Sequence, residues 1–223
     1  MPQEKLMKIK EVAGNLFIRS GYQHTQIRDI AKAAGISVGG VYLLFTCKKA
    51  VLDFVLKCDM DARHLEKEMQ FPISETSFST LQNEVMVTLY KSGIKFAAPL
   101  TEPNRAYPFE QLLADVFDLY TQYGVSWLIL ETDPNGFGRL GAFYAQYKQR
   151  FFDTFLRFIG RYEENGELRP LLQTDQCARL MLETLEFWSA RVKYVTAIRD
   201  IPPAEERKNI CLDALLCAFR AAE

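Results

Sequence analysis

The 223-residue chain is long enough to bury a substantial core, and 48% hydrophobic residues with a net charge of -1 are typical of an ordinary globular protein. No window approaches the roughly eighteen apolar residues of a membrane-spanning helix, and Lys5, Lys8 and Lys10 stand where a signal peptide would be apolar, so we expect a cytoplasmic protein without a membrane partner. Five cysteines without a C-x-x-C pair and only two histidines leave little material for disulfides, metal sites or catalytic triads, so we expect no metal, no cofactor and no enzymatic activity.

The charge is unevenly distributed along the chain. Residues 1–50 hold eight Lys or Arg against three acids, a net of +5, so the remainder carries -6. A basic end on a near-neutral protein fits a local anionic partner such as nucleic acid, although a solvated basic face is the ordinary alternative.

Apolar residues recur at helical spacing almost throughout, which predicts an all-α protein. A first helix ends at Gly21, a good C-terminal residue. A second follows, with Thr25 as its expected cap and Gly35 as its end. Ser37 then caps a short third helix over about 38–45.

A longer fourth helix opens at Cys47 and runs to about Met69. The segment Phe71-Pro72-Ile73-Ser74 breaks the chain after it. The remaining pattern predicts six further helices, at about 75–97, 106–123, 124–132, 139–165, 174–199 and 203–222.

The second and third of these helices, joined by a tight glycine-bearing turn, meet the requirements of a helix-turn-helix. Helix starts present unpaired backbone N–H groups, so Thr25 and Ser37 are placed where a phosphate oxygen could bind. Arg28, one turn into the second helix, can reach a guanine edge or a phosphate, and Tyr42 and Lys48 can reach the DNA backbone.

The sequence TQIRDIAKAAGISVGGVYLLF over 25–45, followed by Lys48, resembles the DNA-binding domain of the TetR family, and the resemblance extends over about residues 4–60. It implies that Thr25, Tyr42 and Lys48 hold phosphates, while Arg28, Val38 and Gly40 face the bases. The full expected DNA-binding set is Thr25, Gln26, Arg28, Ser37, Val38, Gly39, Gly40, Tyr42 and Lys48.

The sequence departs from the family pattern at three positions. Leu44 replaces a frequent His or Tyr, so a phosphate donor is missing there, and Cys47 replaces a small capping residue. Gly40 beside Gly39 removes a side chain from the third helix. Each site residue also has a structural alternative, since Tyr42 could be a half-buried core aromatic and Arg28 or Lys48 a solvated charge.

The helices after residue 174 carry apolar stripes at three-four spacing. They resemble the helix pair that forms a four-helix dimer interface in TetR-like proteins. A protein that binds an operator with two half-sites needs such a dimer. An intramolecular core is the alternative. The expected homodimer interface comprises Leu182, Leu185, Trp188, Val192, Leu212, Leu216 and Phe219.

Residues 107–158 are rich in aromatic side chains. Most aromatics at helical spacing are packing residues, but the family resemblance implies a cavity here, suited to a small apolar or aromatic effector. The expected ligand-binding residues are Tyr107, Phe109, Tyr123, Trp127, Glu131, Tyr147 and Phe152.

The combined expectation is a helix-turn-helix DNA-binding domain over 1–63 and a larger helical effector-binding and dimerisation domain over 64–223. Such a protein would bind double-stranded operator DNA and regulate transcription, most simply as a ligand-responsive repressor. Two alternatives remain at this point: a small helical enzyme or carrier with a basic end, and a regulator that binds DNA but senses no effector.

Overall fold

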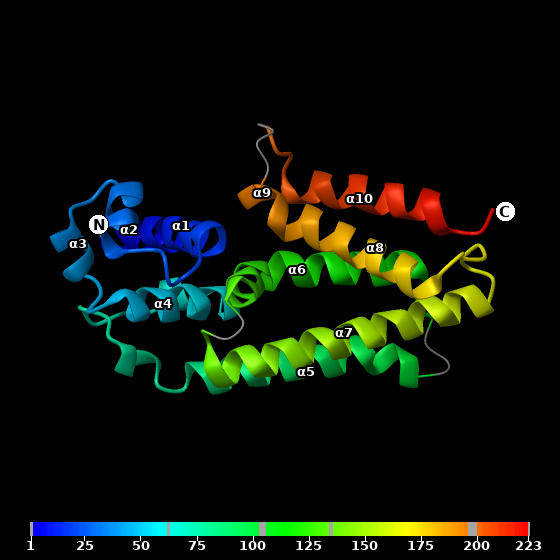
Figure 1. The fold of residues 1–223 in the computed structure, drawn as a ribbon, viewed down its shortest axis with the longest axis horizontal. Helices are drawn as coiled ribbons and strands as arrows, with labels where there is room; N and C mark the ends of the chain where they lie inside the picture. The colour runs from blue at the N-terminus through cyan, green and yellow to red at the C-terminus, as the bar shows by residue number, and fades with distance from the viewer. Residues whose placement is uncertain (1, 62, 103–105, 134–135, 196–199, 223) are drawn as a thin grey trace. The chain divides into compact units, whose positions relative to one another are not determined.

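The computed structural model describes residues 2–61, 63–102, 106–133, 136–195 and 200–222, and these residues contain helices and no β-strand (Figure 1). The all-α prediction is confirmed. The helices are α1 Pro2–Ser20, α2 Ile27–Ala34, α3 Val38–Tyr42, α4 Lys48–Met60, α5 Leu81–Thr101, α6 Phe109–Thr132, α7 Gly138–Glu164, α8 Thr174–Glu186, α9 Val192–Val195 and α10 Ala204–Phe219. Each of the helices in the described segments is too short or too polar to cross a lipid bilayer.

The chain folds into two compact units. The first unit comprises residues 1–88 and 125–144, and the second comprises residues 89–124 and 145–223. The boundaries between them therefore fall inside α5, α6 and α7.

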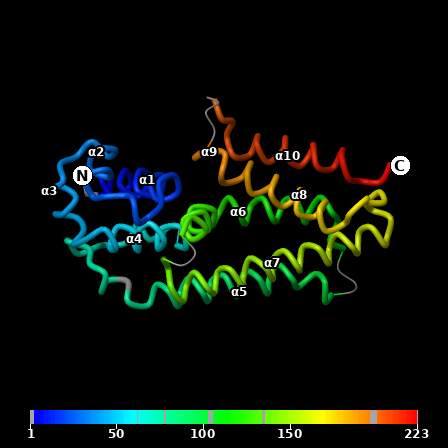
Figure 2. Tube along the Cα trace, in the orientation of Figure 1, coloured from blue at the N-terminus to red at the C-terminus, as the bar shows by residue number. Residues whose placement is uncertain are grey.

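The first unit is built around α1 and α4, with α2 and α3 packed at their ends (Figures 1 and 2). Its core is formed by the apolar faces of these four helices, which exclude water from large side chains. Fully buried members of this core include Ile9, Phe17, Ile30, Val41, Phe45, Val51 and Phe54.

A carboxylate links the far end of α4 to α6 within this unit. Asp59 accepts a hydrogen bond from the backbone N–H of Ser126, 2.8 Å away. Burial raises the pKa of the Asp59 carboxyl to about 6, against the opposing effects of the Ser126 hydrogen bond and of Lys10 on α1. Burial therefore disfavours the charged form of the Asp59 carboxyl.

In the second unit, α8 and α10 lie side by side (Figure 2). Aromatic packing joins α5 to α7, where the rings of Phe96 and Phe151 stack with centroids 4.4 Å apart. Phe109, Phe117, Phe155 and Phe158 are fully buried. These aromatic side chains account for much of the density noted in the sequence, as packing residues.

Between α8 and α9 the helix widens into a π-helical segment, Phe187–Arg191. The guanidinium of Arg207, on α10, donates to the carbonyl oxygens of Trp188 (2.7 Å) and Ser189 (3.2 Å), and also to that of Pro202 (2.7 Å). Arg207 is 2% exposed. A wide helical turn frees carbonyl groups from regular pairing, and here a buried cation satisfies them.

Several helix limits differ from those that the sequence predicts. α3 ends at Tyr42 rather than near 45, α4 ends at Met60 rather than Met69, and one continuous α6 replaces the two helices expected at 106–123 and 124–132. The predicted helix 174–199 comprises α8, the π-helical segment and α9, and its residues 196–199 lie outside the described residues. Helix limits are set by local capping and by tertiary contacts, and the apolar period reports neither.

Candidate nucleic-acid interface

The turn between α2 and α3 forms as the sequence predicts. Gly35 ends α2 in the left-handed conformation, with φ at 70°, a region that glycine enters without the steric cost of a Cβ atom. Two residues later, the Ser37 hydroxyl oxygen accepts a hydrogen bond from the backbone N–H of Gly40 at 3.0 Å and caps α3. The predicted helix-turn-helix is confirmed.

The predicted cap of α2 is wrong by one residue. Gln26 is the capping residue, and its backbone N–H donates to the Asp29 carboxylate at 2.9 Å. Thr25 is 2% exposed, and its hydroxyl donates to the carbonyl oxygen of Gly21 at 2.8 Å. The structure therefore gives the Thr25 side chain an internal role in place of the expected phosphate contact.

Lys48 also has internal partners. Its ammonium donates to the carbonyl oxygens of Tyr22 (2.7 Å), Gln23 (3.3 Å) and Thr25 (3.0 Å), and lies 4.3 Å from the centre of the Tyr22 ring. Burial lowers the pKa of this amine. The first residue of α4 thus holds the loop that precedes α2, and its expected phosphate contact has no support in this geometry.

The remaining predicted DNA contacts lie on the outer surface of the first unit. Arg28 has a 73% exposed side chain, with Asp29 at 3.9 Å as its ion-pair partner. Gln26, Ser37 and Gly39 are exposed and Gly40 is half-buried. Val38 is 42% and Tyr42 is 49% exposed, so about half of the Tyr42 side chain is open to solvent and Tyr42 is not part of the core.

The family pattern singles out position 44, where a frequent phosphate donor is missing, and Leu43 is not among the expected DNA-binding residues. Leu44 is buried and Leu43 is 76% exposed directly after α3. Because Val41 and Phe45 are both fully buried, the helical register alone could have placed residue 43 on the outside.

Cys47 replaces the usual capping residue and still caps α4. Its sulfur accepts from the backbone N–H of Ala50 at 3.4 Å, and its thiol donates to the Glu75 carboxylate at 3.1 Å. The departure from the family pattern at this position therefore keeps the capping function.

The expected dimer interface requires correction. Leu182, Leu185, Val192 and Phe219 are each at most 7% exposed within the single chain, so their side chains fill the protomer's own core and are not available to a partner. Trp188, Leu212 and Leu216 are half-buried. The intramolecular alternative holds for the four buried positions.

Other apolar side chains on these helices are exposed. They are Leu180 on α8, Phe187 in the π-helical segment, Val195 on α9 and Ile210 on α10, with exposed fractions of 55%, 37%, 53% and 45%. Exposed apolar side chains of this size on adjacent helices are typical of an interaction surface.

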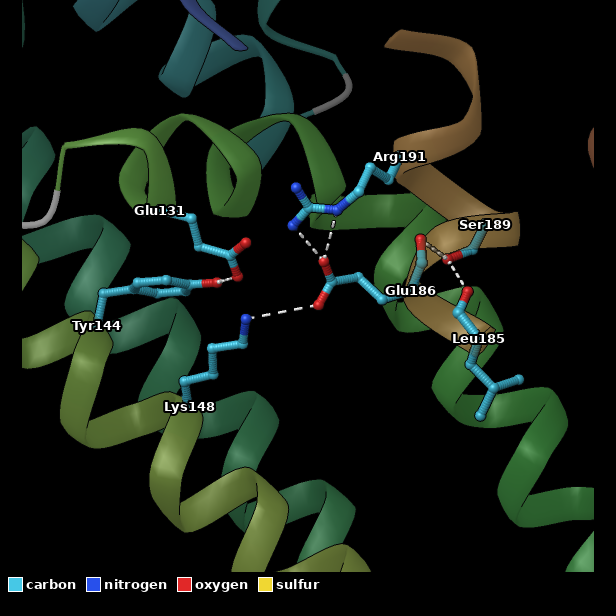
Figure 3. A network of polar contacts seen from close by, with 7 residues as sticks. All are labelled: Glu131, Tyr144, Lys148, Leu185, Glu186, Ser189 and Arg191. Carbon is cyan, nitrogen blue, oxygen red and sulfur yellow. Dashed lines mark hydrogen bonds and ion pairs between the residues drawn. The ribbon is translucent and has the colours of Figure 1, made fainter. Parts of the chain in front are cut away.

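The expected ligand-binding residues fall in both units. In the first unit, Trp127 is 3% exposed, and Glu131 accepts a hydrogen bond from the Tyr144 hydroxyl at 2.9 Å (Figure 3). In the second unit, Phe109 is fully buried and Tyr107, Tyr123 and Phe152 are half-buried. The Tyr147 hydroxyl lies 3.1 Å from that of Ser92.

A charged cluster in the second unit was not found from the sequence. Glu186, only 9% exposed, accepts from the Arg191 guanidinium (2.6 and 3.1 Å), and Lys148 lies 3.5 Å from its other oxygen (Figure 3). Lys148 lies 38 positions before Glu186, so no local pattern marks this pair. The two cations compensate for the loss of hydration that burial imposes on the Glu186 carboxylate.

Comparison with known proteins agrees with this geometry. Residues 9–54 match the family described as bacterial regulatory proteins, tetR family. The chain is 25% identical over 187 residues to the biofilm operon icaADBC HTH-type negative transcriptional regulator IcaR of Staphylococcus aureus, covering 84% of this chain and 83% of that protein. It is 23% identical over 181 residues to the HTH-type transcriptional regulator YfiR of Bacillus subtilis, covering 78% and 73% of the two chains.

A solved structure shares the fold across the whole chain. The ketosteroid transcriptional regulator KstR2 of Mycobacterium tuberculosis superposes with a TM-score of 0.57 at 16% identity, covering 97% of this chain and 95% of that one. The match of residues 9–54, the relatives matched over most of their length and the helix-turn-helix geometry together show that the chain is a DNA-binding transcriptional regulator with a TetR-type DNA-binding domain.

Proposed function

We propose that this regulator represses transcription in the cytoplasm as a homodimer on a palindromic operator, and that a small effector releases it. The observation that carries the DNA contact is the exposed surface formed by the start of α2 and by α3, which includes Arg28 and Tyr42. Repression is supported by the similarity to IcaR, a negative regulator. Residues 1–63 would read DNA, and residues 64–223 would dimerise and bind the effector.

Variants of the exposed surface should weaken operator binding while the fold stays intact. Tyr42→Ala and Arg28→Ala each remove an exposed side chain, and Arg28→Ala should also relax base preference by about 1 to 3 kcal/mol if its guanidinium reads a guanine edge. Affinity should fall steeply with salt because binding releases counterions from phosphates. The measurement is fluorescence anisotropy on a duplex selected from a random pool.

Met7→Ala is the matched control, since Met7 is 58% exposed on α1 and lies outside α2 and α3. Unchanged affinity for the Tyr42 and Arg28 variants, relative to Met7→Ala, would contradict this placement of the DNA surface.

Lys48→Ala should act on stability and not on the DNA surface. It should lower thermal stability because three carbonyl groups lose their hydrogen-bond donor.

The homodimer proposal rests on the exposed apolar side chains of α8 to α10. A regulator that binds a two-fold symmetric operator needs a second copy of the chain, whose DNA-binding domain contacts the other half-site about one helical turn away. Leu180, Phe187, Val195 and Ile210 provide apolar surface that a partner copy would remove from water. This set replaces the buried residues that the sequence favoured.

Leu180→Glu combined with Ile210→Glu should therefore produce a folded monomer with much weaker operator binding. Placing charges in an apolar interface leaves them desolvated and unpaired, whereas both positions are solvated in the single chain. Analytical ultracentrifugation checks the mass. Leu172→Glu, at a 95% exposed position before α8, should remain dimeric. A dimer that survives the double change would place the interface elsewhere.

The effector proposal rests on the aromatic composition of residues 107–158 and stands apart from DNA binding. A screen of apolar and aromatic compounds, read by thermal shift and by release of the selected duplex, tests it. Phe152→Ala should weaken the binding of any active compound that lies in the second unit, and DNA should weaken compound binding by the same factor by which the compound weakens DNA binding. A compound that stabilises the protein without changing DNA affinity would argue for a regulator that senses nothing through this region.

A further inference from the structure

The outer face of α3 is apolar, which is unusual for a helix that reads DNA bases. The helix has the sequence Val-Gly-Gly-Val-Tyr, so Tyr42 is its single polar side chain. Val38 is 42% exposed, and Leu43, which directly follows the helix, is 76% exposed. Burying these neighbouring side chains would gain free energy, so together they favour contact with an apolar group of a partner.

The arrangement of these side chains follows from the helical turn. The backbone N–H of Leu43 donates to the carbonyl oxygen of Gly39 at 2.9 Å, so residue 43 continues the turn of α3. Residues four apart lie one above the other, and side chains tilt toward the helix start. Positions 39 and 43 therefore lie on one face of α3, beside the row formed by Val38 and Tyr42.

Gly39 leaves free space beside the exposed side chains of α3. A Cβ atom added at Gly39 would meet nothing closer than the Ser37 hydroxyl oxygen at 4.0 Å, so the protein itself has room for a side chain there. The neighbouring Gly40 differs, because its added Cβ would lie 3.3 Å from that same oxygen, which caps the helix. Local packing thus explains a glycine at position 40 and leaves the one at position 39 without a structural reason.

The chemistry of base edges identifies the partner of this surface. In the major groove, guanine, adenine and cytosine present hydrogen-bonding groups, whereas thymine adds a methyl group at C5. Val38 and Leu43 can neither donate nor accept a hydrogen bond from their side chains. The methyl group is the feature of a base edge that they can read.

We propose that Val38 and Leu43 are specificity-determining residues that contact thymine methyl groups in each half-site, and that Gly39 allows the close approach this contact needs. The inference rests on the proposed operator binding and adds the base that α3 reads. Arg28, at the start of α2, would supply the hydrogen-bonding part of recognition.

The test starts from duplexes selected by the full-length protein from a random pool. Each selected thymine is replaced in turn by uracil, which has the same hydrogen-bonding edge but no methyl group. Where Val38 or Leu43 contacts the methyl group, binding should weaken about four-fold, as expected for one buried methyl. Leu43→Ala and Val38→Ala should each remove the preference at one position, whereas Met7→Ala, the exposed control on α1, should keep it at every position.

Gly39→Ala provides an independent arm. It should raise thermal stability, because alanine favours a helix more than glycine does and the site has room, yet weaken duplex binding. Selected half-sites without thymine, equal affinity for the thymine and uracil duplexes, or undiminished binding by Gly39→Ala would each overturn this inference while operator binding stands. Failure to enrich any duplex would instead overturn the proposed function.

Discussion

Replacing Arg207 with alanine should destabilise the protein by about 3 kcal/mol or more, because each buried acceptor that loses its donor costs about 1 to 3 kcal/mol. The guanidinium donates to three carbonyl oxygens and is 2% exposed, so water cannot readily take its place. Arg207→Lys should recover only part of the loss, since an ammonium lacks the planar fork that reaches three acceptors. Urea unfolding at fixed protein concentration measures these differences.

Arg220→Ala is the control for this experiment. Arg220 pairs with Glu110 at 3.1 Å, but their side chains are 46% and 58% exposed. Exposed pairs contribute about 0 to 1 kcal/mol, so this variant should differ little from the parent. If Arg207→Ala lost no more stability than Arg220→Ala, the π-helical segment would not depend on its buried cation.

Replacing Asp59 with asparagine should stabilise the protein by about 3 kcal/mol at pH 8, since the folded and unfolded pKa values differ by about two units and one pKa unit corresponds to about 1.4 kcal/mol. The pKa of this carboxyl is about 6 in the folded protein, raised by burial, and about 3.9 in an unfolded chain. The folded state therefore binds more protons between these values. The free energy of unfolding falls as pH rises from about 4 to about 6 and then levels off. Asparagine keeps an oxygen for the Ser126 N–H and removes the buried charge.

The advantage of Asp59→Asn should thus vanish below about pH 4, where the parent carboxyl is protonated in both states. Urea unfolding at several pH values follows the difference. Asp61→Asn is the control of opposite sign, because the Lys67 ammonium, 2.6 Å away, lowers the pKa of Asp61. That variant should gain nothing at pH 8. A loss of stability for Asp59→Asn at pH 8 would show that the carboxylate is stabilised by its surroundings after all.

The features that the sequence predicts well are those that depend on a few adjacent residues. Gly21 and Gly35 adopt positive φ where helices end, and Ser37 caps α3, because capping is a local hydrogen-bonding problem. Thr25 shows the limit of such reasoning. It has the chemistry of a cap, but its hydroxyl pairs with the earlier Gly21 carbonyl oxygen, and Gln26 takes its place.

The dimer helices show a different limit. An apolar stripe tells which side of a helix avoids water, but it does not tell whether the same chain or a second copy covers that side. Leu185 belongs to the strongest stripe of α8 and is fully buried within the protomer, whereas Leu180 on the same helix is 55% exposed. Such a distinction depends on tertiary packing, as does the pairing of Glu186 with Lys148 across 38 positions of sequence.

Within the first unit, α4 has a hydrogen-bond donor side chain at its start and an acceptor side chain near its end. At its start, Lys48 holds the carbonyl groups of the loop before α2, and near its end Asp59 holds a backbone N–H of α6. Lys48 and Asp59 are eleven positions apart, which corresponds to about 16 Å of helix at 1.5 Å per residue. A regular helix resists bending and stretching over this length, so α4 is a rigid element that is hydrogen-bonded to other segments near both ends. Through α4, the position of Ser126 on α6 is therefore tied to that of the loop before α2, the helix that carries Arg28.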